Sequence, residues 1–161
     1  MQVKEYDKAK AIEYAKKWAY LRNTKFYDYE NLGGDCTNFI SQCIYAGTNT
    51  MNYSNINGWY YNNANAKSPS WTGVELLYKF LTTNKTVGPF GNEVNRIEID
   101  NGDIVQLSFD GIKFAHSLFI VNRINDKIFV ATHTFDALNR DLDTYHYSKL
   151  RYIKIKGYRD W

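Results

Sequence analysis

Apolar residues recur at helical spacing in three segments of the first half of the chain. Residues 7–21 carry such a stripe between lysines, residues 36–47 carry a second one that begins after Asp35 and ends at Gly47, and residues 72–82 carry a third. A stripe with a period of about 3.6 residues is typical of a helix that buries one face. Asp favours helix starts and Gly favours helix ends. The sequence therefore predicts three helices in this half.

Alternation of apolar and polar residues dominates the second half of the chain. Turn signals such as Asp100-Asn101-Gly102 and Asp110-Gly111 separate the alternating runs. Strands are expected at residues 96–99, 103–109, 114–121, 127–134 and 149–158. Helices followed by a meander of strands are typical of an α+β domain. With no internal repeat and no linker, the sequence predicts a single domain over residues 1–161.

Between the second and third helices, residues 48–71 show neither period and are rich in Asn and aromatic residues. Long loops inside compact domains are usually functional or act as lids. We therefore expect this loop to border a cleft. Trp59, Tyr60 and Tyr61 are its candidate ligand-binding residues; Trp59 or Trp71 is expected to pack as structure, with Tyr60 or Tyr61 nearer to a ligand.

Composition narrows the function classes. Hydrophobic residues make up 44% and charged residues 23% of the chain, which indicates a globular protein rather than a disordered one. The net charge of +3 is spread without a dense run of Lys and Arg, so we expect no nucleic-acid partner. No apolar run reaches the roughly 18 residues of a membrane span, and the N-terminus lacks the apolar core of a signal peptide. We expect a monomer and leave its localisation open, since the chain could be a domain of an exported or wall-associated bacterial protein.

The chain has two cysteines, Cys36 and Cys43, and both fall in the second predicted helix. Seven residues along a helix span about 10 Å, whereas a disulfide needs Cα atoms within roughly 7 Å, so both thiols should be free. Metal-ligand spacings such as CxxC or HxxxH are absent, and we expect no metal site. Helix-start amides lower a thiol pKa, which makes Cys36 a candidate nucleophile. Alternatively, Cys36 is a small, unreactive residue of the core, which is the role we expect for Cys43.

A cysteine nucleophile needs a base, and the chain offers three histidines. His116 falls in an otherwise apolar strand, where an imidazole needs a partner. His133 ends the next strand, and His146 is expected at the surface. A cysteine at a helix start, a histidine on a later strand and a polar orienting group on the following strand match the arrangement of papain-type sites.

Register counting predicts how the first two histidines lie. A four-residue loop between their strands places His116 opposite His133. A tighter turn at residues 125–126 places His133 opposite Leu118. His116 is then its diagonal neighbour on the same face, about 7 to 8 Å away between backbones. A shift by one residue would send them to opposite faces. We therefore predict that His133 makes the hydrogen bond that orients His116, with Asp136 as the nearest alternative.

The segment GGDCTNFISQCIYAG at residues 33–47, with NGDIVQL, FAHSLFIV and IFVATHT further along, resembles the Putative amidase domain family of bacteria. That family is similar to the NlpC-like cell-wall cysteine peptidases, which have a papain-like fold. The resemblance runs from about Tyr6 to Asp141. NlpC-like enzymes usually continue Asp-Cys-Ser-Gly where this chain has Asp-Cys-Thr-Asn, so substrate subsites do not transfer. The family tends to have Gly-Gly where Gly47-Thr48 stands, which concerns the helix end.

The resemblance implies a papain-like, NlpC-like α+β fold with the nucleophile at a helix start packed on an antiparallel sheet. It implies Cys36 as nucleophile, His116 as base and His133 as the orienting group of an amidase or peptidase. The reaction that the resemblance implies is amide hydrolysis through an acyl-enzyme, on the peptide part of peptidoglycan, without a cofactor. In NlpC-like enzymes the residue at Asp35 helps to bind a substrate amine, although an N-cap role explains Asp35 equally well.

Three alternatives stay open. An acyltransferase such as a transglutaminase would use the same three groups and pass the acyl group to an amine, so an amine acceptor distinguishes it. A non-catalytic glycan-binding module would stack sugars on the aromatic side chains of the loop, and its binding would survive the loss of Cys36. The aromatic candidates are Tyr53, Trp59, Tyr60, Tyr61 and Trp71. An immunity protein or structural relative would keep the fold without the activity.

Overall fold

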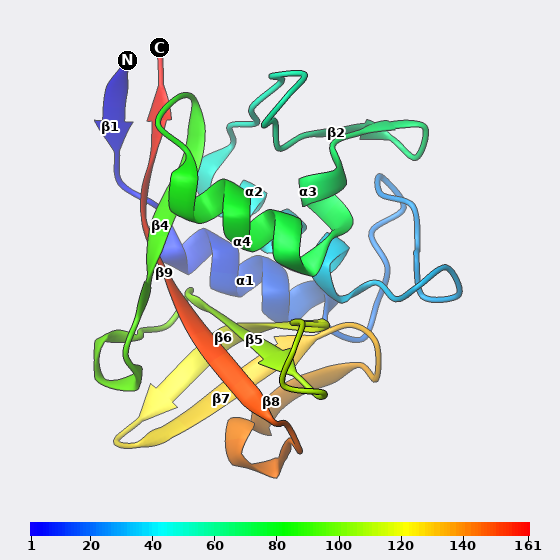
Figure 1. Ribbon diagram of the computed structural model, residues 1–161, viewed down its shortest axis with the longest axis vertical. Helices are drawn as coiled ribbons and strands as arrows, with labels where there is room; N and C mark the ends of the chain where they lie inside the picture. Colours follow the sequence, from blue (N-terminus) through cyan, green and yellow to red (C-terminus); the bar gives the residue numbers. More distant parts are fainter.

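The computed structural model describes all 161 residues and is an α+β structure (Figure 1). Its helices are α1 (Lys8–Trp18), α2 (Cys36–Thr48), α3 (Pro69–Thr72) and α4 (Val74–Thr83), with 3-10 helices η1 (Arg96–Glu98) and η2 (Leu142–Thr144). Its strands are β1 (Gln2–Lys4), β2 (Tyr61–Asn63), β3 (Ala66–Lys67), β4 (Gly88–Val94), β5 (Ile104–Ser108), β6 (His116–Ile124), β7 (Lys127–Thr132), β8 (Ala137–Asp141) and β9 (Lys149–Asp160). No helix combines the length and the apolar character that crossing a membrane requires.

One seven-stranded sheet organises the molecule. Its order is β1-β9-β5-β6-β7-β8, with β4 also on β9, and every pairing is antiparallel. The long strand β9 pairs with β5 over its first part and with β4 and β1 over its second. Because β1 pairs with the end of β9, the two termini lie side by side (Figure 1). Strands β2 and β3 form a separate hairpin.

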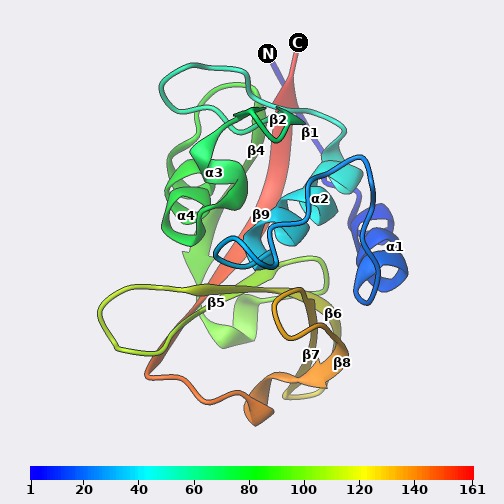
Figure 2. The same cartoon turned by 90° about the vertical axis from the view of Figure 1, so that its right-hand side faces the viewer.

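The sheet has a different apolar cluster on each face. The larger cluster joins the helices to the sheet and contains Phe39 of α2 and Phe119 of β6. The smaller cluster contains Leu118 and Ile120 of β6. Successive residues of β6 thus enter different clusters, as the alternation of side chains along a strand requires. The helices lie together on one side of β5–β8 (Figure 2), so a β6 or β7 side chain faces either the helices or the second cluster.

The predicted helices form, but two of their ends differ from expectation. The first helix ends at Trp18 rather than at residue 21. The second continues past Gly47 to Thr48 and ends at Asn49, which adopts the left-handed conformation with φ 49°. A Cβ at Gly47 would lie 2.4 Å from the ring of Tyr6. Glycine is needed there for the close approach of the chain before α1, and not as a helix terminator.

The strand predictions succeed for β5, β6, β7 and β9 and fail at two places. Residues 96–99, expected as a strand, form η1 and its end. No strand was predicted over the glycine- and proline-containing segment of β4, yet it pairs with β9 along its whole length. Gly91 permits this pairing because a Cβ there would lie 2.0 Å from the carbonyl oxygen of Lys154. Close backbone approach is a known reason for glycine in a strand.

The hairpin of β6 and β7 combines the predicted tight turn with a bulge. Ile124 pairs with Lys127, so residues 125–126 form the turn, and Asn125 has a positive φ. Between Ile120 and Asn122 the register shifts by one residue, which leaves Val121 as the extra residue of β6. A β-bulge of this kind reverses which face the following residues occupy relative to the partner strand. The shift decides where the two histidines lie.

Candidate active site

Cys36 is the first residue of α2, and the chain before it is tightly packed. Gly33 and Gly34 have φ values of 90° and 100°, a region that favours glycine. A Cβ at Gly34 would lie 2.9 Å from Thr134 Oγ1. The same oxygen accepts a hydrogen bond from the backbone N–H of Asp35 at 2.9 Å. These contacts fix the start of α2 against the segment that follows β7.

The Cys36 thiol lies beside the backbone of β6. Its side chain is 6% exposed, and its Sγ is 3.7 Å from Thr37 Oγ1. Thr37 Oγ1 is in turn 3.0 Å from Ser117 Oγ. Burial raises the pKa of the Cys36 thiol, and this outweighs the donors that lower it: the N–H of Ser117 and the hydroxyl and N–H of Thr37. The lowered pKa that the helix start predicts is therefore wrong for the resting protein, although donors for a thiolate are in place.

His116 begins β6, directly before Ser117. It is 7% exposed and lies between two aromatic side chains, with ring centroids 6.4 Å from Phe109 and 6.3 Å from Tyr145. Burial, and after it the positive charge of Arg140, lower the pKa of His116 to about 4. The imidazole is therefore neutral at neutral pH and can accept a proton.

A cavity of about 290 Å³ opens beside the His116 ring. Its lining comes from the β5–β6 connection, from the residues after β7, from β8 and from the segment after η2: Phe109, Ala115, His116, Thr134, Phe135, Arg140 and Tyr145. Through Thr134, which accepts from the Asp35 amide, this cavity adjoins the start of α2. The base candidate thus lines a cavity that adjoins the loop carrying the nucleophile candidate.

His133 does not orient His116, and that prediction is wrong. Its Nδ1 lies 2.5 Å from Asp35 Oδ2, and its Nε2 donates to the carbonyl oxygen of Trp18 at 2.9 Å. Its ring stacks on Phe39 of α2 at 4.1 Å between centroids. His133 is 1% exposed and faces the helices. The bulge at Val121 is the physical reason, because it shifts the pairing by the one residue that sends the two histidines to opposite faces of the sheet.

Asp35 is an internal anchor in this structure. Its carboxylate is buried, with Oδ1 accepting from the N–H of Tyr29 and from Asn38 Nδ2, both at 2.8 Å, while Oδ2 faces His133. It makes no side-chain hydrogen bond to the amides of the helix start. Both sequence-based roles, contact with a substrate amine and side-chain N-capping, therefore disagree with the geometry. The carboxylate is 1% exposed, and its buried hydrogen bonds stabilise the loop that leads into Cys36.

The remaining cysteine and histidine lie as predicted. Cys36 and Cys43 are both free. Cys43 is fully buried in the larger apolar cluster, and burial raises the pKa of its thiol well above the ordinary value. His146 is exposed. Asp136, the alternative orienting group, instead binds the guanidinium of Arg22 at 3.0 Å.

Aromatic residues of the 48–71 loop are mostly part of the core. Trp59 is fully buried, packs against Trp71 with ring centroids 4.7 Å apart, and donates from Nε1 to Ser41 Oγ. Tyr61 is 7% exposed, and its hydroxyl accepts from the N–H of Tyr27. The complete burial of Trp59 contradicts its predicted ligand-binding role and agrees with the expectation that it packs as structure. Tyr60 is half-buried and lines one surface cavity, and Tyr61 lines another.

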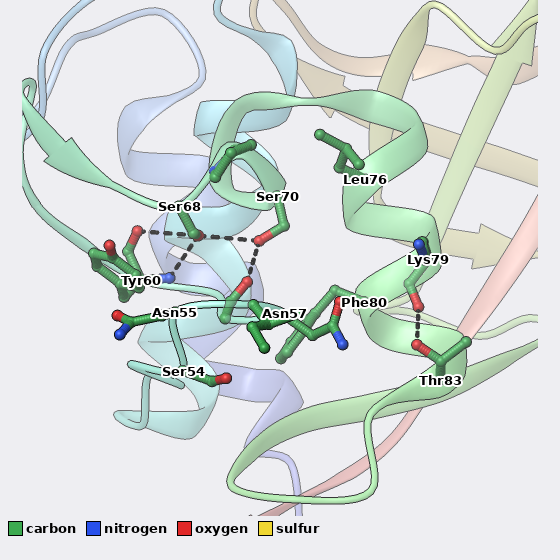
Figure 3. A pocket seen from close by; sticks show the side chains of 13 residues that line it. Ser54, Asn55, Asn57, Tyr60, Ser68, Ser70, Leu76, Lys79, Phe80 and Thr83 are labelled. Atoms are coloured by element: carbon green, nitrogen blue, oxygen red, sulfur yellow. Dashed lines mark hydrogen bonds between the residues drawn. The ribbon is translucent and has the colours of Figure 1, made fainter.

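The cavity lined by Tyr60, of about 220 Å³, lies between the loop and α4 (Figure 3). Neither Cys36 nor His116 lines it. Ser68 and Ser70 point at one another in its wall, 3.0 Å apart between hydroxyl oxygens, and Ser70 donates to the carbonyl oxygen of Gly58. Conversely, no residue of 48–70 lines the cavity beside His116. The prediction that the loop borders the cleft of the candidate nucleophile and base is therefore wrong for that cavity.

Comparison with known proteins assigns the chain to a family. Residues 5–156 match the family described as Putative amidase domain. The chain belongs to this family. The family is described as an amidase family, and amidases hydrolyse amide bonds. The uncharacterized protein YhbB of Bacillus subtilis (strain 168) is 29% identical over 139 residues, which cover 84% of this chain and 44% of YhbB. The chain thus spans less than half of that relative's length, and no solved structure matches it.

Sequence reasoning missed three residues close to the candidate nucleophile and the candidate base: Ser117, Thr134 and Arg140. Ser117 and Thr134 directly follow the two histidines, and that adjacency was the available signal. Arg140 had no local signal, because its approach to His116 depends on how β8 pairs with β7. No group of three or more His, Cys, Asp or Glu side chains is arranged to hold a metal ion.

Proposed function

We propose that the protein hydrolyses amide bonds with Cys36 as nucleophile, through an acyl-enzyme, and that its substrate is the peptide part of bacterial peptidoglycan. We also propose that the domain has the papain-like fold of NlpC-like peptidases. The observation that carries the mechanism is the position of the Cys36 thiol beside the amide of Ser117, the residue directly after His116. The amidase family of the chain supports the chemistry.

In this proposal the resting pair is uncharged. Burial opposes the thiolate of Cys36 and the imidazolium of His116 alike. His116 therefore acts as a general base, taking the thiol proton as the sulfur attacks the substrate carbonyl. As negative charge forms on the sulfur, the amide of Ser117 and the donors of Thr37 stabilise it. A carboxylate is not needed to hold the base, because the aromatic side chains beside the ring restrict it.

The oxyanion of the tetrahedral intermediate accepts from the backbone N–H of Cys36. This N–H is the first of α2, and first-turn amides have no acceptor within their own helix. His116 then gives the proton to the leaving amine, the C–N bond breaks, and the acyl group stays on Cys36 Sγ as a thioester. Water, deprotonated by His116, attacks the thioester and releases the carboxylic acid, and the proton returns to the thiol.

The test is incubation of the purified chain with peptidoglycan and mass spectrometry of the released fragments. Wild type should release fragments with new amine and carboxyl ends, and Cys36→Ala should release none. Cys43→Ala is the matched control, since it removes an equivalent thiol from the core, and it should retain turnover. Product from Cys36→Ala would overturn the proposal, as would the absence of product from wild type.

An amine acceptor added to the same reaction separates hydrolysis from acyl transfer. The proposal expects free carboxylic acid as the main product. A fragment covalently joined to the added amine would instead identify an acyltransferase that uses the same residues. Retention of wall glycan by both wild type and Cys36→Ala, without product from either, would identify the binding module.

A further inference from the structure

Arg140 presents an unneutralised cation to the cavity beside His116. Its guanidinium lies on the face of the Tyr145 ring, 3.7 Å from the centroid. Its Nε donates to Thr144 Oγ1 at 2.8 Å, and its Nη2 donates to the Thr144 carbonyl oxygen at 3.2 Å. The ion pairs of the structure include four carboxylates around Arg22 and none at Arg140. The guanidinium is thus held in one orientation, with Nη1 left without a bonded partner.

The other walls of this cavity are largely apolar. Phe109 is 55% exposed and Phe135 is 87% exposed, and both line the cavity with Ala115. Two aromatic side chains left in water beside a cation suit a ligand with an apolar part and an anionic end. The volume of about 290 Å³ is near the lower limit for small-ligand sites, so it fits one residue of a peptide rather than a long segment.

We propose that this cavity binds the part of the amide substrate that carries a free carboxylate, with Arg140 as the residue that contacts the carboxylate. The inference rests on the proposed function and adds a substrate class to it: peptides with an acidic group within one residue of the scissile bond. Arginine suits the task because its planar fork matches a carboxylate. The stacking on Tyr145 and the bonds to Thr144 have already restricted the side chain, which lowers the entropy cost of binding.

A carboxylate bound at Arg140 also changes the pKa of His116, the proposed base. Arg140 is the charged group that lowers the pKa of His116, after burial. The Tyr145 ring also adjoins the His116 ring, and its hydroxyl is neutral at neutral pH because burial raises its pKa. A bound carboxylate offsets the charge of Arg140. His116 then becomes a stronger base when an acidic substrate is present.

A binding experiment tests the carboxylate site without turnover. The probes are N-acetyl-L-phenylalanine and its amide, added to the Cys36→Ala protein, with the pKa of His116 followed by NMR. The acid should raise the pKa of His116 and the amide should not. Arg140→Gln should abolish the response to the acid. Arg159→Gln is the matched control, because Arg159 also stacks on an aromatic ring, Phe90, without a carboxylate partner, and lies outside the cavity.

An equal response to acid and amide would overturn the proposal, and so would an unchanged response in Arg140→Gln. Turnover gives a second readout. Peptidoglycan whose carboxyl groups have been converted to amides should raise KM for wild type by about tenfold or more, the size expected for loss of a charge-assisted hydrogen bond. Arg140→Gln should show that higher KM on native wall and little difference between the two walls. If wild type releases no fragments, the proposed hydrolysis fails, while the NMR result still decides the carboxylate site.

Discussion

The carboxylate of Asp35 and the imidazole of His133 form a buried pair, with Oδ2 and Nδ1 2.5 Å apart. Because Nε2 of the same ring donates to the Trp18 carbonyl, one proton is shared between Nδ1 and the carboxylate. Asp35 directly precedes Cys36, so the pair joins α1, the start of α2 and the end of β7. Its role in the proposed enzyme is to position the nucleophile rather than to orient the base.

Removal of one partner of this pair should be costly. His133→Ala should lower the free energy of unfolding by about 3 to 5 kcal/mol, because it leaves the Asp35 carboxylate buried without its partner. Denaturant unfolding measures the change. Asp35→Asn combined with His133→Ala should recover part of the loss, since the neutral amide costs less to bury. His146→Ala, at an exposed site, is the control and should stay within about 0.5 kcal/mol of wild type. A His133→Ala protein as stable as this control would show that the pair contributes nothing.

Alkylation should distinguish the two thiols. Iodoacetamide should label Cys36 before Cys43, since Cys36 is 6% exposed and Cys43 is fully buried. The labelling rate should keep rising above pH 9, because burial raises the pKa of the Cys36 thiol above that ordinary value. Peptide mass spectrometry over a pH series measures both effects, with Cys36→Ala and Cys43→Ala as references. Equal labelling of the two cysteines would argue against Cys36 as the nucleophile.

His116 should make stability depend on pH in a defined window. Its pKa is about 4 in the folded protein and 6.5 as an ordinary imidazole. The unfolded chain therefore binds more protons between these values, and the free energy of unfolding falls as the pH falls from about 6.5 to about 4. The expected loss is about 3 kcal/mol. His116→Gln should remove this dependence, whereas His146→Gln should keep it. Identical pH profiles for wild type and His116→Gln would refute the prediction.

The two glycines before Cys36 offer a matched pair of substitutions. Gly33→Ala should cost about 1 to 2 kcal/mol of unfolding free energy, the strain of a side chain in the left-handed region, because its Cβ would meet open space. Gly34→Ala adds a clash with Thr134 Oγ1, the acceptor of the Asp35 amide. It should therefore be less stable than Gly33→Ala by about 1 kcal/mol or more. Gly34→Ala should also lose more turnover. Equal unfolding free energies would show that Thr134 can move aside freely.

Periodic elements were predictable from the sequence, and the irregular ones were not. The apolar stripes of α1, α2 and α4 and the alternation in β5 and β9 carry their own signals. Strand β4 lacks such a signal, since its two glycines and its proline are typical of turns. It forms because β9 supplies the partner and because Gly91 lets the two backbones approach.

At the candidate site the sequence singled out a candidate nucleophile and a candidate base and misassigned their partners. Cys36 and His116 stand out locally, one at a helix start and one in an apolar strand. The partners depend on contacts across the fold: His133 meets Asp35 from 98 positions away, and Arg140 reaches His116 through strand pairing. A bulge has no reliable sequence signal, so register counting from the turn alone could not place His133.

Because of the single extra residue at Val121, the imidazoles of His116 and His133 lie in different surroundings. His116 lines an open cavity beside Arg140, and His133 is buried against the carboxylate of Asp35. Without that extra residue, the pairing set by the turn would place both imidazoles on one face of the sheet. Histidines in distant members of this family are therefore equivalent only when their bulges are aligned as well, and identity of residue type alone does not establish a shared role.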